Sequence, residues 1–128
     1  MKYMILIYGD EREMARLSEA ERTGMFEEYN QFTKELVSAK AYGGGASLKE
    51  IATATSVRVR NGKTVTTDGP FAETKEQLGG FYIVDCESLD EAVKWAAKIP
   101  CIRHSHGSCE VRPFGIITGP DGGIAAMQ

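Results

Sequence analysis

The sequence has few of the residues that define several protein classes. It holds three cysteines, an odd number that fits no closed disulfide framework, so we expect a reduced, cytoplasmic protein. The N-terminal apolar run ends at Gly9 and Asp10, too early for a signal-peptide core or a membrane span. The net charge of -3 lacks the basic excess that a nucleic-acid interface requires. We therefore expect neither a membrane nor a nucleic acid as partner.

The length of 128 residues suits a single domain. We place this domain at residues 1–117. Residues 118–128 form a Gly-rich C-terminal tail, in which Gly119, Pro120, Gly122 and Gly123 leave little to pack. The tail is expected to be a flexible or accessory arm.

Two segments read as strands that are apolar on both faces. In the first, residues 2–8, Tyr3, Ile5 and Ile7 point one way, and Met4, Leu6 and Tyr8 point the other way. The second covers residues 81–85. Such strands belong in the middle of a sheet that is covered on both sides.

Two amphipathic helices are also predicted. The first runs from about residue 19 to residue 40, behind a capping box at Ser18 and Glu21, and the triplet at residues 43–45 is expected to end it. The second follows Ser88, uses Leu89, Ala92, Val93, Ala96 and Ile99 as its apolar face, and is terminated by Pro100. Residues 46–54 are expected to be loop-rich, with at most a short strand.

A hairpin is centred on Asn61-Gly62, the pair best suited to a type I′ turn. Its register places Val59 opposite Thr64 and Val57 opposite Thr66 on one face. A last strand follows in residues 107–117.

The order of these elements predicts a ferredoxin-like α+β fold, an antiparallel sheet with two helices on one face. Two helices cover only one face, whereas two strands are apolar on both. A second copy, packed sheet against sheet, is the economical cover for the other face. We therefore expect a homodimer that forms a dimeric α/β barrel around a cavity.

The stretch "VRVRNGKTVTTDGPFAETKEQLGGFYIVDCESLDEAVKWAAKIP", followed by "GSCEVRPF", resembles the DGPF-domain branch of the YCII-related proteins. The resemblance extends from Met1 to Phe114. It implies a dimeric α+β barrel and bacterial proteins of largely unassigned activity, often encoded beside extracytoplasmic-function sigma factors. It also implies a His of the first helix and an Asp as a catalytic pair in other members. The first helix of this chain has Tyr29 and Asn30 but no His, and Asp68 would match the acid.

Asp68 is the first candidate catalytic residue. Its side chain can accept backbone N–H groups of the Gly69-Pro70 turn, which is a structural role. In an intersheet cavity, the same carboxylate could instead act as an acid or base, because desolvation raises its pKa. Phe71 is expected to anchor the core first and to line a cavity second.

Six other side chains are candidates for binding a ligand. Glu73 and Lys75 read either as a solvated charge run or as the mouth of a cavity. Arg112 shares a strand face with Glu110, so it either forms an ion pair or orients an anionic ligand. Tyr8, Tyr29 and Tyr82 are packing residues whose hydroxyls could reach the cavity.

Cys101, His104, His106 and Cys109 are all possible zinc ligands. Their spacing matches no zinc-finger pattern, and Cys109 shares a strand face with Val111, as a small buried residue would. No cofactor fingerprint is present in the sequence. We therefore expect neither a metal nor a cofactor.

Two functions remain open, and whether the protein is an enzyme is undecided. One is binding of a small organic molecule in the intersheet cavity of the dimer, with cofactor-free acid–base chemistry by Asp68. The alternative is a non-catalytic regulatory or interaction module, linked to sigma-factor-associated transcription control. In that case the hairpin or the tail would be the contact surface.

Overall fold

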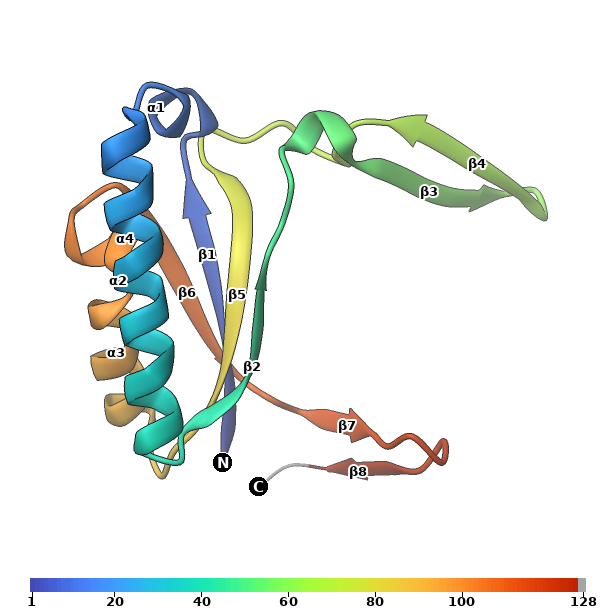
Figure 1. Ribbon diagram of the computed structural model, residues 1–128. Helices are drawn as coiled ribbons and strands as arrows, with labels where there is room; N and C mark the ends of the chain where they lie inside the picture. The colour runs from blue at the N-terminus through green and yellow to red at the C-terminus, as the bar shows by residue number, and fades with distance from the viewer. Residues whose placement is uncertain (127–128) are drawn as a thin grey trace.

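A four-stranded antiparallel sheet forms the centre of the protein (Figure 1). The computed structural model describes residues 1–126. In the order β2, β5, β1 and β6, the strands span Tyr42–Ser47, Gln77–Asp85, Lys2–Gly9 and Gly107–Pro113. The two strands with apolar side chains on both faces, β1 and β5, take the central positions, as the sequence predicted.

Two helices cover one face of this sheet, α2 (Glu19–Ser38) and α3 (Leu89–Lys98) (Figure 1). The capping box at Ser18 and Glu21 is present. The helix ends two residues before the expected limit, because Lys40 adopts a left-handed φ of 59°. The ferredoxin-like α+β fold is therefore confirmed for the single chain.

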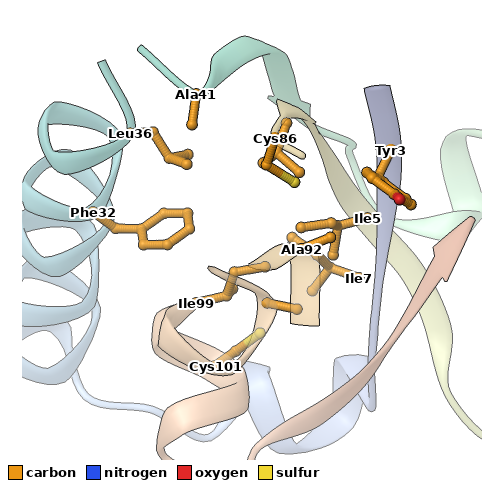
Figure 2. Close-up of a cluster of buried hydrophobic side chains, with 12 residues drawn as sticks. Tyr3, Ile5, Ile7, Phe32, Leu36, Ala41, Cys86, Ala92, Ile99 and Cys101 are labelled. Atoms are coloured by element: carbon orange, nitrogen blue, oxygen red, sulfur yellow. The ribbon is translucent and has the colours of Figure 1, made fainter. Parts of the chain in front are cut away.

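The core lies between the helices and the sheet (Figure 2). Tyr3, Ile5 and Ile7 of β1 are buried, while the side chains between them are only half-buried. Phe32 and Leu36 of α2 pack in the same cluster of buried side chains. No polar or charged residue in the described part of the chain is buried. Apolar burial is thus the main stabilising contribution to the fold.

The second helix buries a narrower face than expected. Ala92, Ala96 and Ile99 are buried, but Leu89 and Val93 are exposed. Two alanines at helical spacing bring the backbone close to the sheet, so only a thin stripe of the helix reaches the core. Pro100 ends this helix and also begins α4 (Pro100–Arg103). At the first position of a helix the backbone N–H has no partner within the helix, so its absence in proline loses no hydrogen bond.

The expectation that the glycine triplet ends the first helix is wrong. The triplet lies in β2, at the edge of the sheet beside β5. A Cβ on Gly43 would come within 2.8 Å of the Ile83 side chain, and a Cβ on Gly45 within 2.9 Å of the Tyr82 ring. The absence of side chains lets this edge strand lie close against bulky neighbours.

Two hairpins project from the side of the sheet opposite the helices (Figure 1). The first joins β3 (Thr55–Arg60) to β4 (Lys63–Asp68). Its turn has positive φ at both Asn61 and Gly62, and its register is the predicted one.

The second hairpin joins β7 (Ile116–Thr118) to β8 (Ile124–Ala126). It forms in the segment expected to be a loose tail, so strand pairing begins before the boundary placed at residue 118. Residues 127–128 of that tail lie outside the described residues. The division into domain and tail stays a prediction.

Two short helical turns connect these parts, α1 (Glu11–Ala15) and η1 (Ile51–Thr53). Neither was predicted, because each is too short for a periodic pattern. Asp10 caps α1, and the Glu11 carboxylate accepts a hydrogen bond of 2.9 Å from the Ile51 backbone N–H. No helix in residues 1–126 is long and apolar enough to cross a membrane.

Two glycines give a matched test of this packing. Gly24 lies within α2, and a Cβ added to it would meet nothing within 4 Å, so Gly24→Ala should raise the free energy of unfolding by about 0.5–1 kcal/mol. Gly45→Ala should lower it, because the new methyl group meets the Tyr82 ring and the Phe81 carbonyl oxygen. Urea unfolding of both variants measures the difference. Equal effects would contradict the close approach of β2 to β5.

The three cysteines predict a loss of stability in alkali. Burial raises the pKa of the Cys86, Cys101 and Cys109 thiols above their ordinary value of 9.0. A pKa raised by folding stabilises the protein below the unfolded pKa, and this stabilisation is lost as the pH rises through the folded pKa. We expect the urea midpoint to fall from about pH 9 upward, and to fall less steeply in Cys101→Ala. An unchanged midpoint across that range would contradict the burial of the thiols.

Candidate functional site

The sheet face that points away from the helices is largely apolar and only half-buried in the single chain; we call it the open face. Strand pairing places Met4 opposite Ile83, Leu6 opposite Phe81 and Tyr8 opposite Leu78 on this face. All six are half-buried. Glu110 and Arg112 of β6 pair with Leu6 and Met4 on the same face, and they form the ion pair that their spacing predicted.

A cavity of about 790 Å³ lies where the first hairpin leaves the sheet; we call it the hairpin-foot cavity. Tyr8 and Leu78 line it from the open face, and Pro70 and Phe71 line it from the corner that follows β4. Lys49, Glu50 and Arg58 bring charges to the same wall. Phe71 is 82% exposed in the single chain, so it lines a cavity and does not anchor the core. That corrects the expectation for this residue.

Asp68 ends β4 and is exposed. The hydrogen bonds that hold its corner come from other groups. Gly69 N–H donates to the Ala54 carbonyl at 2.7 Å, and the Ser56 hydroxyl donates to the Gly69 carbonyl at 2.8 Å. Gly69 also takes a φ of 102°, a conformation that favours glycine. The corner is therefore closed without the carboxylate that was expected to fix it.

A second cavity, of about 320 Å³, lies on the other side of the sheet between α2 and the strands β2 and β5; we call it the helix-side pocket. Its lining is apolar and aromatic, with several hydroxyl groups. The lining residues are Ile7, Phe26, Tyr29, Thr33, Tyr42, Gly45, Ala46, Ser47, Gly79, Gly80, Phe81 and Tyr82.

Two tyrosines of this pocket are fixed by their surroundings. The Tyr82 hydroxyl and the Thr33 Oγ1 are hydrogen-bonded at 2.9 Å, and the Tyr82 ring packs edge to face on Phe32, with the centroids 5.1 Å apart. Burial raises the pKa of Tyr82, against the lowering effect of the Thr33 hydrogen bond. Burial and then the nearby Cys101 thiol raise the pKa of Tyr29. Both phenols are therefore neutral at physiological pH.

The structure separates the site residues that the sequence grouped together. Tyr8 and Phe71 meet at the hairpin-foot cavity, whereas Tyr29 and Tyr82 meet in the helix-side pocket. The four charged candidates are exposed and line neither of these cavities: Asp68, Glu73, Lys75 and Arg112. The four aromatic candidates thus lie at two places on opposite faces of the sheet, and the charged candidates lie at neither.

Several lining residues escaped the sequence reasoning. Thr33 lies four positions after Tyr29 on α2, so helical spacing could have placed both on one face. Tyr42 and Ser47 were missed because β2 was not expected through the glycine triplet.

The four possible zinc ligands do not form one cluster. Cys101 is buried in the core, whereas His104 lies at the surface with its Nε2 2.9 Å from the Glu28 carboxylate. Arg103 binds the same carboxylate, through Nη2 at 2.6 Å. Within residues 1–126 no group of three or more His, Cys, Asp or Glu side chains is arranged to hold a metal.

Comparison with a solved structure agrees with this fold. The structure of 5-chloro-2-hydroxyhydroquinone dehydrochlorinase from Burkholderia phenoliruptrix, in complex with 2,5-dihydroxybenzoquinone, superposes with a TM-score of 0.53. The match covers 89% of this chain and 93% of the other, at 14% sequence identity. At this identity the likeness concerns the fold alone.

Sequence comparison is more specific. An uncharacterized protein of Rhizobium meliloti is 40% identical over 116 residues, which make up 91% of this chain and 94% of that protein. The profile of the YCII-related domain matches residues 1–115. The chain therefore belongs to the YCII-related domain family.

Proposed function

We propose that the protein is a homodimer, packed open face to open face, that binds a small organic molecule in the cavity between the two sheets. The observation that carries this proposal is the open face itself. Its side chains from β1 and β5 are apolar, yet both covering helices lie on the other side of the sheet, and these side chains are only half-buried (Figure 1). Apolar faces of this kind mark interfaces or binding sites.

The hairpin-foot cavity supports the location of the ligand site. It opens beside the open face and combines aromatic walls, Tyr8 and Phe71, with the charged side chains of Lys49 and Arg58. Ligand sites combine these features, an apolar body for affinity and a few polar groups for orientation. A second copy would complete the enclosure, because Phe71 has little cover in one chain. In the dehydrochlorinase a fold of this kind holds a small organic molecule, 2,5-dihydroxybenzoquinone.

Cofactor-free acid–base chemistry by Asp68 belongs to the same proposal. Asp68 is two positions before Pro70, which lines the hairpin-foot cavity, but it is exposed in the single chain. Its carboxylate can act only if the second copy covers the corner. Arg112, on the open face, is the proposed partner for an anionic group of the ligand. Assignment to the DGPF branch and a cytoplasmic location complete the proposal.

A second candidate function rests on the first hairpin. Val57 and Val59 lie on one face of it and are 61% and 68% exposed. Exposed valines on a projecting ribbon suit a contact surface for another protein. This observation favours a regulatory or interaction module, for which the sigma-factor context implied by the resemblance would supply the partner.

The dimer is tested by a charge placed on the open face. Leu6→Lys should give a folded monomer, because the Glu110 carboxylate opposite it already pairs with Arg112, so the interface would bury an uncompensated positive charge. Val37→Lys, an exposed position on α2, is the matched control and should stay dimeric. Light scattering coupled to gel filtration reads out the mass. A folded wild-type monomer at micromolar concentration would contradict the proposal.

The ligand site is tested by native mass spectrometry of the purified protein. The wild-type dimer should carry an additional small mass, and Phe71→Ala should lose it, because the aromatic wall of the cavity is removed. Val59→Ala, near the tip of the hairpin, should retain it. Retention in Phe71→Ala would place the ligand elsewhere.

Acid–base chemistry is tested separately by Asp68→Asn. Stability should change by less than about 0.5 kcal/mol, because the residue is exposed and the bonds of the corner come from Gly69 and Ser56. The co-purifying ligand should still bind, while its turnover, followed by mass spectrometry, should stop. Unchanged turnover would remove the catalytic role and leave binding alone.

A further inference from the structure

The helix-side pocket lies within one chain, on the opposite side of the sheet from the proposed dimer cavity, so it calls for an explanation of its own. No Asp, Glu, His, Lys or Arg side chain lines it; the lining is aliphatic, aromatic, glycine or hydroxyl-bearing. Glu11, Arg22 and Glu50 line the neighbouring hollow, beyond Phe26 and Gly79. The pocket proper therefore offers a ligand no counter-ion.

The hydroxyl groups define what the pocket can bind. The Thr33–Tyr82 hydrogen bond uses one hydroxyl proton, whichever group donates, and leaves the other proton and several lone pairs free. Tyr29, Tyr42 and Ser47 add hydroxyl-bearing side chains on other walls. A ligand could both donate and accept hydrogen bonds in this pocket without carrying a charge.

The shape of the pocket follows from backbone features. The pairing of β1 with β5 shifts register after Ile7, which leaves Gly79 as the extra residue of a bulge at the pocket. Gly45 and Gly80 contribute no side-chain volume to the wall. The aromatic rings of Tyr82 and Phe26 border the space, and Phe26 is 67% exposed. A volume of about 320 Å³ is at the small end of ligand pockets, which suits a compound of one ring.

From these observations we infer that the helix-side pocket is a second ligand site, which takes an uncharged, planar, single-ring molecule bearing a hydroxyl or carbonyl group. The ring would pack against aromatic side chains, and the polar group would bond to the Thr33–Tyr82 hydroxyl pair. An ionised ligand would lose its hydration without gaining a partner of opposite charge. The site goes beyond the proposed function, because it needs no second copy.

The test uses p-cresol as the probe for the site, in NMR titrations of the full chain. Saturable binding should shift the backbone amides of Gly45, Ser47, Gly79 and Gly80. 4-Methylbenzoate has a similar shape but carries a negative charge, and should bind at least about tenfold more weakly. 4-Methylcyclohexanol keeps the hydroxyl but is not planar, and should also bind more weakly than p-cresol.

Two variants test the assigned residues. Thr33→Val keeps the volume and removes the hydroxyl, so p-cresol affinity should fall by about three- to tenfold. Ser47→Phe fills the pocket from an exposed position on the edge strand, and should abolish binding while the far-UV circular dichroism stays that of the wild type.

Two further variants separate this site from the proposed function. Phe71→Ala alters only the hairpin-foot cavity, and Leu6→Lys alters only the open face, so both should bind p-cresol as the wild type does. Equal affinity for 4-methylbenzoate, shifts centred on Tyr8 and Leu78, or binding that survives Ser47→Phe would each overturn the inference. A titration that does not saturate by about 10 mM p-cresol would also overturn it, because such an affinity is too weak for a specific site.

Discussion

The pairing of β1 with β5 is the constraint on which the rest of the structure depends. Ile5 lies opposite Tyr82 and Tyr3 opposite Val84, so these side chains point toward the helices. Because side chains alternate along a strand, the same register sends Leu6 and Phe81 to the open face. One set of backbone hydrogen bonds therefore determines both the core and the surface that a second copy would cover.

The bulge in this pairing explains why two cavities lie near the same end of the sheet. The register shifts between Ile7 and Tyr8, and Gly79 is the residue left without a partner. After the shift, Leu78 faces the hairpin-foot cavity, while Gly79 lines the helix-side pocket. A bulge bends a strand and opens its pairing, so a single irregularity makes room on both faces.

The first hairpin shows how local preference and tertiary stability differ. Its turn and register follow from Asn61-Gly62 and from alternation, and both could be predicted. A two-stranded ribbon is marginally stable by itself, and the valines of this one are exposed. The sequence thus specifies the conformation of the hairpin, whereas its valines gain little cover from the rest of the described chain.

The sequence by itself determined the elements whose signals are local: the strand alternation of β1 and β5, the capping box at Ser18 and the hairpin turn. Only the tertiary structure decided which side chains meet. It placed the glycine triplet in an edge strand and left Phe71 exposed to solvent. It also placed Tyr29 and Tyr82 on the opposite side of the sheet from Tyr8. The physical reason is that caps, turns and alternation depend on neighbours within a few residues, whereas the glycines and tyrosines are placed by pairing between strands far apart in the chain.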